Sequence, residues 1–386
     1  MKKLIFVTLI AGLSLAVLAQ QITHESLVIN IEVPVRVFKG GRFVDGLTIN
    51  DFSIFEDGKP QQIEAVYLIK KTDIQREELE MKKNRVMKKF SPDVSRHFIL
   101  LFDIMDYLPK IDEALHYFFE RVISPHDTLV VVTPMKSYSF NKETLAALSH
   151  EKIAERLIEI IRRDTILGNN RYKSLIRDYE SIYRAEYETK TKLYMLMDKI
   201  RELKNLRYLG EDKVLYFADY LKSITGQKFA FFFYQKELLP FPDIPFESRE
   251  FMDMQSELAF FASFDTKNIS RAYSDSSISL HFLYVTKTQM AHGDVENMGQ
   301  TEMNMQEMSL DIFNTFHEIA KATGGLTESS TNVASLLKNA ADASENYYLL
   351  YYTPRLYIGD GKFKKIEVKV KNKDYRITHR AGYIAN

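Results

Sequence analysis

Two kinds of hydrophobic pattern divide the chain. Toward both ends, short segments alternate apolar and polar residues, which is typical of strands with one buried face. In the middle, continuous apolar runs alternate with segments whose apolar residues recur every three or four positions. This pattern predicts a parallel sheet flanked by helices. The expected strands of the sheet span residues 98–102, 128–133, 229–234 and 279–285. The expected helices span residues 110–123, 142–163, 212–224, 248–262 and 310–323.

The β segments at the two ends are each too small to bury a face alone. Glycine-containing turns at Gly40-Gly41 and Asp57-Gly58 separate the first group of strands, and Gly359-Asp360-Gly361 interrupts the last group. Because sheets of so few strands are marginally stable, we expect residues 20–71 and 345–386 to combine into one small β-sandwich. An α/β domain would then be inserted between the two halves of the sandwich.

The inserted α/β domain is expected to span residues 95–344, with two polar segments beside or within it. Residues 72–94 are charged and are expected to form a linker or a short surface helix. A helical insertion is expected at about residues 150–225, because an apolar stripe from Leu175 to Leu203 recurs at steps of three and four. This stripe favours packing within its own domain, and a partner-binding arm is the alternative.

The first 19 residues have the pattern of a Sec signal peptide. Lys2 and Lys3 precede an apolar run, and Val17-Leu18-Ala19 resembles a signal peptidase site. We therefore expect cleavage after Ala19 and a secreted or periplasmic protein with no membrane span. An uncleaved anchor is the alternative, although the run is short for a ~20-residue span.

Composition narrows the classes of function. The 52 basic and 52 acidic residues balance, and cleavage would remove Lys2 and Lys3 and leave a net charge of −2. No overall field would then attract nucleic acid or anionic lipid. The chain has no Cys, so we expect neither disulfides nor thiolate chemistry.

An acidic residue, Asp103, ends the apolar run of the first expected strand. Ligands of open α/β sheets bind at the carboxyl ends of the strands, so residues that follow the strands are candidates for binding. Tyr and Met are enriched in protein interfaces, and this enrichment favours a protein partner. The candidate binding residues follow two of the strands and are Asp103, Met105, Asp106, Tyr107, Lys236 and Glu237.

Three further features are weak alone and fairly specific together. They are Phe43–Thr48 followed by Glu56–Pro60, the helix end Ala322-Thr323-Gly324-Gly325, and Tyr351–Pro354 leading to Arg380-Ala381-Gly382-Tyr383. With the strand that ends in Asp103, they resemble the von Willebrand factor A-related secreted proteins of acidobacterial-type bacteria. The resemblance implies a von Willebrand A-like doubly wound sheet, here inserted in the small β-sandwich.

The resemblance also implies a divalent metal site, but this sequence departs from the motif that forms the site in the family. The family motif is Asp-x-Ser-x-Ser, with a Thr and an Asp from later loops, and its oxygens suit Mg²⁺. Here Asp103, Met105 and Tyr107 stand in its place. A thioether does not suit Mg²⁺, and Tyr234-Gln235-Lys236-Glu237 stands where the later Asp is usual. Thr165 is the threonine that chain order suggests.

A degenerate motif of this kind leaves two interpretations open. Asp103 and Asp106 could hold a weakly bound Mg²⁺ with waters, or Asp103 could cap the following helix or bind backbone amides. We expect the second, and therefore a metal-independent protein with no cofactor.

Other motifs in the sequence lack the context that their chemistry requires. Asp275, Ser277 and Ser279 match Asp-x-Ser-x-Ser, but they precede an apolar strand, whereas the metal loop follows one. His317 begins a near match to the zinc-protease helix in which Lys321 replaces the second His. The sequence contains no Gly-x-Ser-x-Gly nucleophile elbow and no phosphate-binding Gly-x-x-x-x-Gly-Lys.

The sequence therefore favours a non-enzymatic protein–protein interaction or adhesion module of the bacterial envelope or exterior. The expected contact surface is the carboxyl end of the sheet around Asp103, Asp106 and Tyr107. Metal-dependent ligand binding through Asp103 and Asp106 and a structural or assembly role are the alternatives, and a hydrolase has the least support. The partner would be another protein, with no nucleic acid bound, and the oligomeric state is open.

Overall fold

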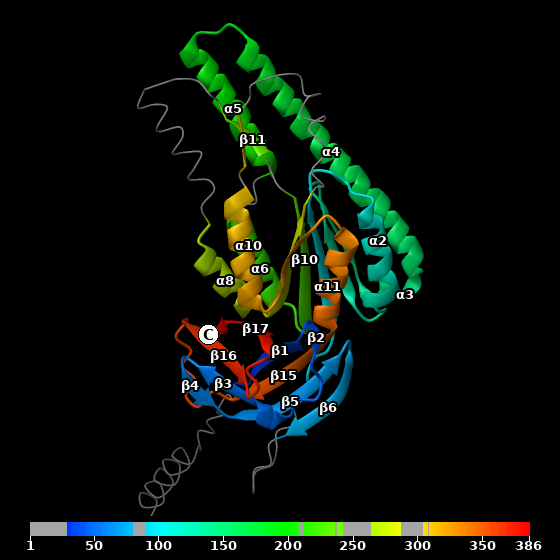
Figure 1. Cartoon of the computed structure of the whole chain (residues 1–386), viewed down its shortest axis with the longest axis vertical. Coiled ribbons are helices and arrows are strands. Elements are labelled where there is room, and N and C mark those ends of the chain that lie inside the picture. Colours follow the sequence, from blue (N-terminus) through cyan, green and yellow to red (C-terminus); the bar gives the residue numbers. More distant parts are fainter. Residues whose placement is uncertain are drawn as a thin grey trace, which may run out of the picture.

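The structure is a computed structural model that describes residues 29–79, 90–207, 211–235, 238–241, 264–286, 304–307 and 309–386. It consists of an α/β part and a smaller all-β part (Figure 1). The α/β class predicted from the sequence is confirmed. The signal peptide, the expected helix at residues 248–262, and both Lys236 and Glu237 lie outside the described residues.

The α/β part is built on a six-stranded sheet in the order β14-β12-β10-β7-β8-β9. All neighbours are parallel except β9, which pairs antiparallel with β8. The four predicted strands are β7, β8, β10 and β12. The two outer strands are short, β9 alternates serine with an aromatic residue and β14 is polar, so no apolar run marks either of them in the sequence. The strands are β7 (Arg96–Asp103), β8 (Thr128–Val132), β9 (Ser137–Phe140), β10 (Gln227–Tyr234), β12 (Ile278–Val285) and β14 (Thr327–Ser330).

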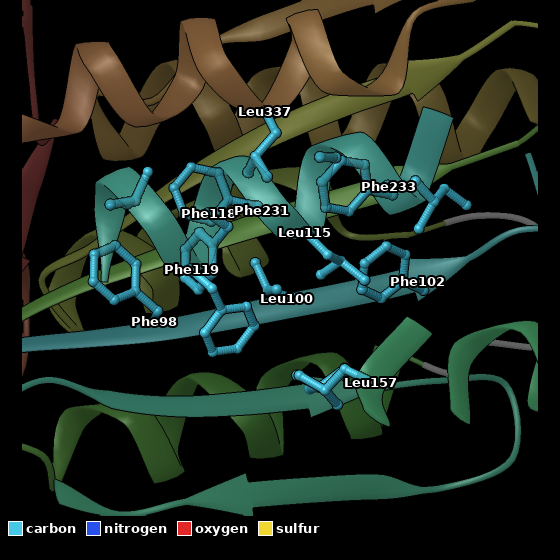
Figure 2. Close-up of a cluster of buried hydrophobic side chains, with 14 of the residues drawn as sticks. Phe98, Leu100, Phe102, Leu115, Phe118, Phe119, Leu157, Phe231, Phe233 and Leu337 are labelled. Atoms are coloured by element: carbon cyan, nitrogen blue, oxygen red, sulfur yellow. The ribbon is translucent and has the colours of Figure 1, made fainter. Parts of the chain in front are cut away.

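Helices cover both faces of this sheet, and strand alternation sorts the side chains between them. Phe98 and Phe102 of β7 face α2, α4 and α11, and the ring of Phe102 stacks on Phe233 of β10 at 4.8 Å (Figure 2). Ile99 of β7 and Phe232 of β10 face α6, α8 and α10. The helices are α2 (Lys110–Tyr117), α3 (Lys142–Ala147), α4 (His150–Arg184), α6 (Glu211–Lys222), α8 (Thr266–Asp275), α10 (Ser309–Thr323) and α11 (Val333–Glu345), and a π-helical turn at Phe118–Val122 extends α2.

The all-β part is a sandwich of two sheets that use strands from both ends of the chain. One sheet has the order β17-β1-β15-β5-β6, with β2 beside β1, and the other has the order β18-β16-β3-β4. Their facing side chains form one core that includes Val35, Ile54, Tyr348 and Ile366. The strands are β1 (Ile31–Lys39), β2 (Arg42–Phe43), β3 (Phe52–Glu56), β4 (Lys59–Gln61), β5 (Ile63–Lys70), β6 (Asp73–Leu79), β15 (Asn346–Tyr352), β16 (Phe363–Val370), β17 (Arg376–His379) and β18 (Gly382–Ile384), and Ile49–Asp51 form a 3₁₀ turn before β3.

Residues 73–79 form strand β6, where a linker or short helix was predicted. The segment is polar because β6 lies at the edge of its sheet and, among the described strands, pairs only with β5. Tyr67 of β5 donates its hydroxyl to Glu77 Oε1 at 2.8 Å. The edge position and its partner strand, rather than the local sequence pattern, account for this strand.

The helical insertion begins with α4, a single helix of 35 residues that continues well beyond the sheet (Figure 1). Its first half packs on the sheet through Leu157 and Ile161. Its second half pairs with α5 (Thr189–Arg207) in a helical hairpin with its own apolar clusters, which include Tyr179 and Leu196. The predicted stripe therefore packs within the hairpin. A short antiparallel pair, β11 (Leu238–Phe241) and β13 (Asn304–Glu307), lies beside α5.

The two parts meet at the amino ends of the parallel strands. Gln227, which begins β10, donates from its side chain to Glu32 Oε1 of β1 at 2.9 Å. The carboxyl ends of β7 and β10 consequently point away from the sandwich, toward the helical hairpin (Figure 1). This arrangement leaves the carboxyl edge of the sheet as the place to look for a site.

Candidate functional site

The carboxyl ends of β7 and β10 form a topological switch point. Along the chain, the sheet first grows from β7 toward β9 and then continues from β10 on the other side of β7. Chain reversal of this kind leaves a crevice beyond the strand ends where ligands of open α/β sheets bind. Asp103 ends β7, and Gln235 follows β10 and donates its backbone N–H to Asp103 O at 3.0 Å.

Gln235 organises the loop that follows β7. Its Oε1 accepts from the backbone N–H groups of Met105 and Asp106, each at 2.8 Å, and its Nε2 donates to Asp106 O at 3.2 Å. The side chain is almost fully buried, at 1% exposed. A neutral amide therefore satisfies three backbone groups of the loop and fixes its shape.

Helix α4 contributes a second contact to the same loop. Asn169 Nδ2 donates to Asp106 Oδ1 at 3.2 Å. Thr165, one turn earlier on α4, is 1% exposed, and its hydroxyl has no hydrogen-bond partner among the described residues. Side chains four residues apart share a helix face, so Thr165 and Asn169 lie on the same side of α4.

Tyr107 is held in place by two charged neighbours. Its hydroxyl donates to Asp112 Oδ1 in the first turn of α2, and Arg162 of α4 donates to the other oxygen of Asp112 at 3.1 Å. The Arg162 guanidinium also lies 5.0 Å from the centre of the Tyr107 ring. Burial and the neighbouring Asp112 carboxylate raise the pKa of Tyr107, so the phenol stays protonated and keeps this hydrogen bond.

The candidate binding residues differ in how much surface they offer. Asp103, Asp106 and Tyr107 are partly exposed, whereas Met105 is only 8% exposed and offers little contact area. The amide of Gln235 and the side chain of Asn169 shape the rim, and the sequence alone did not point to them. Gln235 binds backbone groups and Asn169 binds the Asp106 side chain, in each case across a long stretch of sequence that no local pattern encodes.

Another hydrogen-bonded cluster lies beside this edge, where β8 ends. Asp164 of α4 accepts from Thr133 and Tyr138, each at 2.8 Å, and from the adjacent Arg163. Burial alone would raise the pKa of Asp164, but these hydrogen bonds outweigh it and lower the pKa. Both carboxylate oxygens are used, so Asp164 fixes α4 against the β8–β9 turn.

The donor set at the carboxyl edge is sparse for a divalent cation. Within the described ranges, no group of three or more His, Cys, Asp or Glu side chains is placed to hold a metal ion. The Tyr107 hydroxyl is committed to Asp112, and one oxygen of Asp106 accepts from Asn169. The side chain of Gln235, where the family resemblance implies an Asp, is bonded to backbone.

The second Asp-x-Ser-x-Ser match joins the two parts of the molecule. Ser277 Oγ accepts from Arg380, and Ser279 Oγ accepts from Arg36 Nη2 at 3.1 Å. Asp275 Oδ1 accepts from the Ile384 N–H at 2.7 Å. All three side chains thus bind residues of the sandwich, and the motif serves as a structural junction at the amino end of β12.

Glycines of the motifs that carry the family resemblance are also structural. Gly324 ends α10 with a φ of +73°, a conformation that favours glycine. A Cβ on Gly325 would clash with the backbone carbonyl of Leu280 in β12. The Ala-Thr-Gly-Gly sequence therefore allows the chain to turn tightly against the sheet.

No family model and no curated protein matches this chain. Among solved structures, it is similar to the human COPII-coat protein Sec24c, with 9% sequence identity and a TM-score of 0.33. The similarity covers 77% of this chain and 44% of that one, so the chain spans less than half of that structure's length. A similarity at this level assigns neither a fold family nor a function. None of the helices in the described ranges combines the length and the apolar character needed to cross a membrane.

Proposed function

We propose that this protein is a non-enzymatic protein-binding module whose α/β part has von Willebrand factor A-like architecture. The strand order supports this architecture, since it is doubly wound with its reversal between β7 and β10. The sequence motifs at Gly324-Gly325 and Arg380 are accounted for by their structural roles in the same fold. The partner is proposed to be another protein of the bacterial envelope or exterior, which the signal-like residues 1–19 support.

The Gln235 side chain is the single observation that carries the proposal. A metal-dependent rim is held together by a cation and its oxygen ligands, whereas here a buried neutral amide holds the loop after β7. The engagement of the Tyr107 hydroxyl by Asp112 and of one Asp106 oxygen by Asn169 also supports a rim without a bound cation. We therefore propose that the rim binds its partner without a metal.

The proposed contact surface consists of Asp103, Asp106 and Tyr107, with Lys236 and Glu237 next to Gln235 in the chain. Tyr107 is its anchor, because an aromatic ring held by Asp112 and Arg162 loses little conformational entropy on binding. Met105 supports the loop from within the fold.

Affinity capture from the envelope of the host, followed by quantitative binding to the captured protein, tests this surface. Tyr107→Ala should weaken binding by about tenfold or more, as expected for an aromatic anchor. Tyr216→Ala, at a tyrosine that is 77% exposed on α6, is the matched control and should leave binding unchanged.

Thermal unfolding with and without Mg²⁺ distinguishes metal-independent binding from the alternative of metal-dependent ligand binding. The partial exposure of Asp103 and Asp106 favours that alternative. We expect Mg²⁺ to leave the melting temperature and partner binding unchanged. Stabilisation by Mg²⁺ that disappears in both Asp103→Ala and Asp106→Ala would instead establish the metal-dependent function.

A further inference from the structure

A groove of about 950 Å³ lies between the α/β part and the sandwich. Helices α8 and α10 form one wall, and strands β16 and β17 form the other. In Figure 1 these helices stand directly above the two strands. The residues that line the groove do not include Asp103, Asp106 or Tyr107, so it is separate from the rim at the carboxyl edge.

Positive charge is concentrated in this groove although the chain as a whole is neutral. Its two acidic side chains each lie near a lysine, Glu318 with Lys321 at 3.8 Å and Glu367 with Lys369 at 3.1 Å. Except for Lys321, the basic side chains of the groove form no ion pair with any described residue. The basic side chains that line the groove are Lys267, Arg271, Lys321, Lys365 and Arg376.

This excess charge favours an anionic ligand. Walls of one sign focus the electrostatic field within a cleft and raise the local concentration of the opposite charge. Lys267 and Arg271 come from α8, whereas Lys365 and Arg376 come from the sandwich, so an anionic chain that follows the groove would meet cations on both walls.

The floor of the groove fits a peptide better than a nucleic acid. Leu326 and Ile377, which are both partly exposed, contribute apolar surface. The ring of Phe363 is covered by the Arg271 guanidinium, which lies 5.4 Å from the ring centre. Binding of single-stranded nucleic acid relies on bases stacking against open aromatic faces, and the Arg271 guanidinium already occupies this face of Phe363.

Strand β17 offers backbone contacts to an extended ligand. It pairs with β1 and is the edge strand of its sheet within the described structure. An unpaired edge can accept an added strand from another chain. Two hydroxyls in the lining, Ser270 Oγ and Thr378 Oγ1, also have no hydrogen-bond partner in the part of the chain that the structure describes.

We propose that this groove binds an extended acidic segment of a partner protein. The segment's backbone runs along the edge of β17, and its carboxylates pair with Lys267, Arg271, Lys365 and Arg376. Side chains of an extended peptide alternate between two sides, so apolar residues between the acidic ones cover Leu326 and Ile377. This second site does not depend on the function proposed for the carboxyl edge.

Fluorescence anisotropy with the purified protein and a labelled peptide that alternates Glu and Val tests the proposal. The peptide should bind, its affinity should fall as salt is added, and a peptide with Lys in place of Glu should not bind. Joint substitution of Arg271→Glu and Lys365→Glu should weaken binding by about tenfold or more. Lys152→Glu, at an exposed lysine of α4 outside the groove, is the control and should have no effect.

A second double variant, Lys267→Glu with Arg376→Glu, should weaken binding to a similar degree. It keeps the test valid if the first double variant does not fold. The proposal is overturned if neither pair changes peptide affinity, or if polyphosphate or single-stranded DNA binds the groove as tightly as the peptide. Residues 242–263 of this chain are themselves rich in acidic residues. If the peptide binds only after these acidic residues are neutralised, the chain's own segment is the occupant, and this result would also overturn the proposal. Tyr107→Ala should leave peptide binding unchanged, so failure here leaves the carboxyl-edge proposal intact.

Discussion

His281 lies within β12 with no exposed surface, and its ring stacks on Phe231 at 5.2 Å. The backbone N–H of Leu326 donates to its Nδ1 at 3.3 Å, so Nδ1 must be the acceptor of a neutral ring. The other nitrogen, Nε2, then carries the proton and donates to Ser344 Oγ at 2.9 Å. Burial, with the Arg36 guanidinium as the second cause, lowers the pKa of His281 from 6.5 to about 3.

The lowered pKa of His281 makes the free energy of unfolding depend on pH. Well above pH 6.5 the ring is neutral in both states and contributes no pH dependence. Below it, the unfolded chain binds a proton that the folded protein excludes, so stability falls by about 1.4 kcal/mol per pH unit toward the folded pKa. Urea unfolding at several pH values should show this slope, and His281→Gln should make it shallower by about one proton. An unchanged slope in the variant would contradict a neutral buried His281.

At the scale of elements, α4 belongs to two structures. Its first half packs in the core on one face of the sheet, and its second half pairs with α5 in separate apolar clusters. Leu196 and Met197 of α5 are buried against Tyr179 of α4, which shows that the hairpin has a small core of its own. Separate cores predict that the hairpin can open without unfolding the sheet.

Leu196→Asp places a charge in the hairpin core and tests this separation. We expect a loss of about 2–5 kcal/mol of local stability. Hydrogen exchange should accelerate in α5 and in the second half of α4, while β7 and β10 stay protected. Tyr194→Asp, at a position that is 49% exposed on the same helix, should change little. Loss of protection throughout β10 would show that the hairpin and the sheet unfold as one unit.

At the scale of the whole molecule, buried arginines of the sandwich join it to the sheet. Arg36 of β1 donates to Gly324 O at 3.4 Å and to Ser279 Oγ at 3.1 Å, and its guanidinium lies over the rings of Phe229 and Tyr347. Burial lowers the pKa of Arg36 to about 10, so it remains charged near neutral pH. Because this buried cation contacts both parts, we expect it to couple them in unfolding.

Arg36→Ala should uncouple the sandwich from the sheet. It leaves two buried acceptors without a donor and opens space between the aromatic rings, at a cost of about 2–4 kcal/mol. Calorimetry should show one unfolding transition for the unaltered protein and two for the variant. Arg42→Ala, at an exposed arginine of β2, is the control and should retain one transition. A single transition in Arg36→Ala would mean that other contacts suffice to couple the two parts.

The sequence by itself determined the alternation of strands and helices in the middle of the chain. The apolar runs of β7 and β10 are bulky on both sides, which is stable only within a sheet covered on both faces. It also placed Asp103 and Tyr107 at the end of the first of these strands, because a carboxylate that ends an apolar run is visible in the sequence.

Only the tertiary structure decided what the polar side chains do. Gln235 binds the backbone of Asp106, 129 residues earlier, and Arg380 binds Ser277, 103 residues earlier. Strand β6 forms at an edge where β5 supplies the pairing, and the basic groove assembles from two helices and two strands that are distant in the chain. Such roles depend on which partner lies opposite a side chain, and the spacing of residues along the chain does not contain that information.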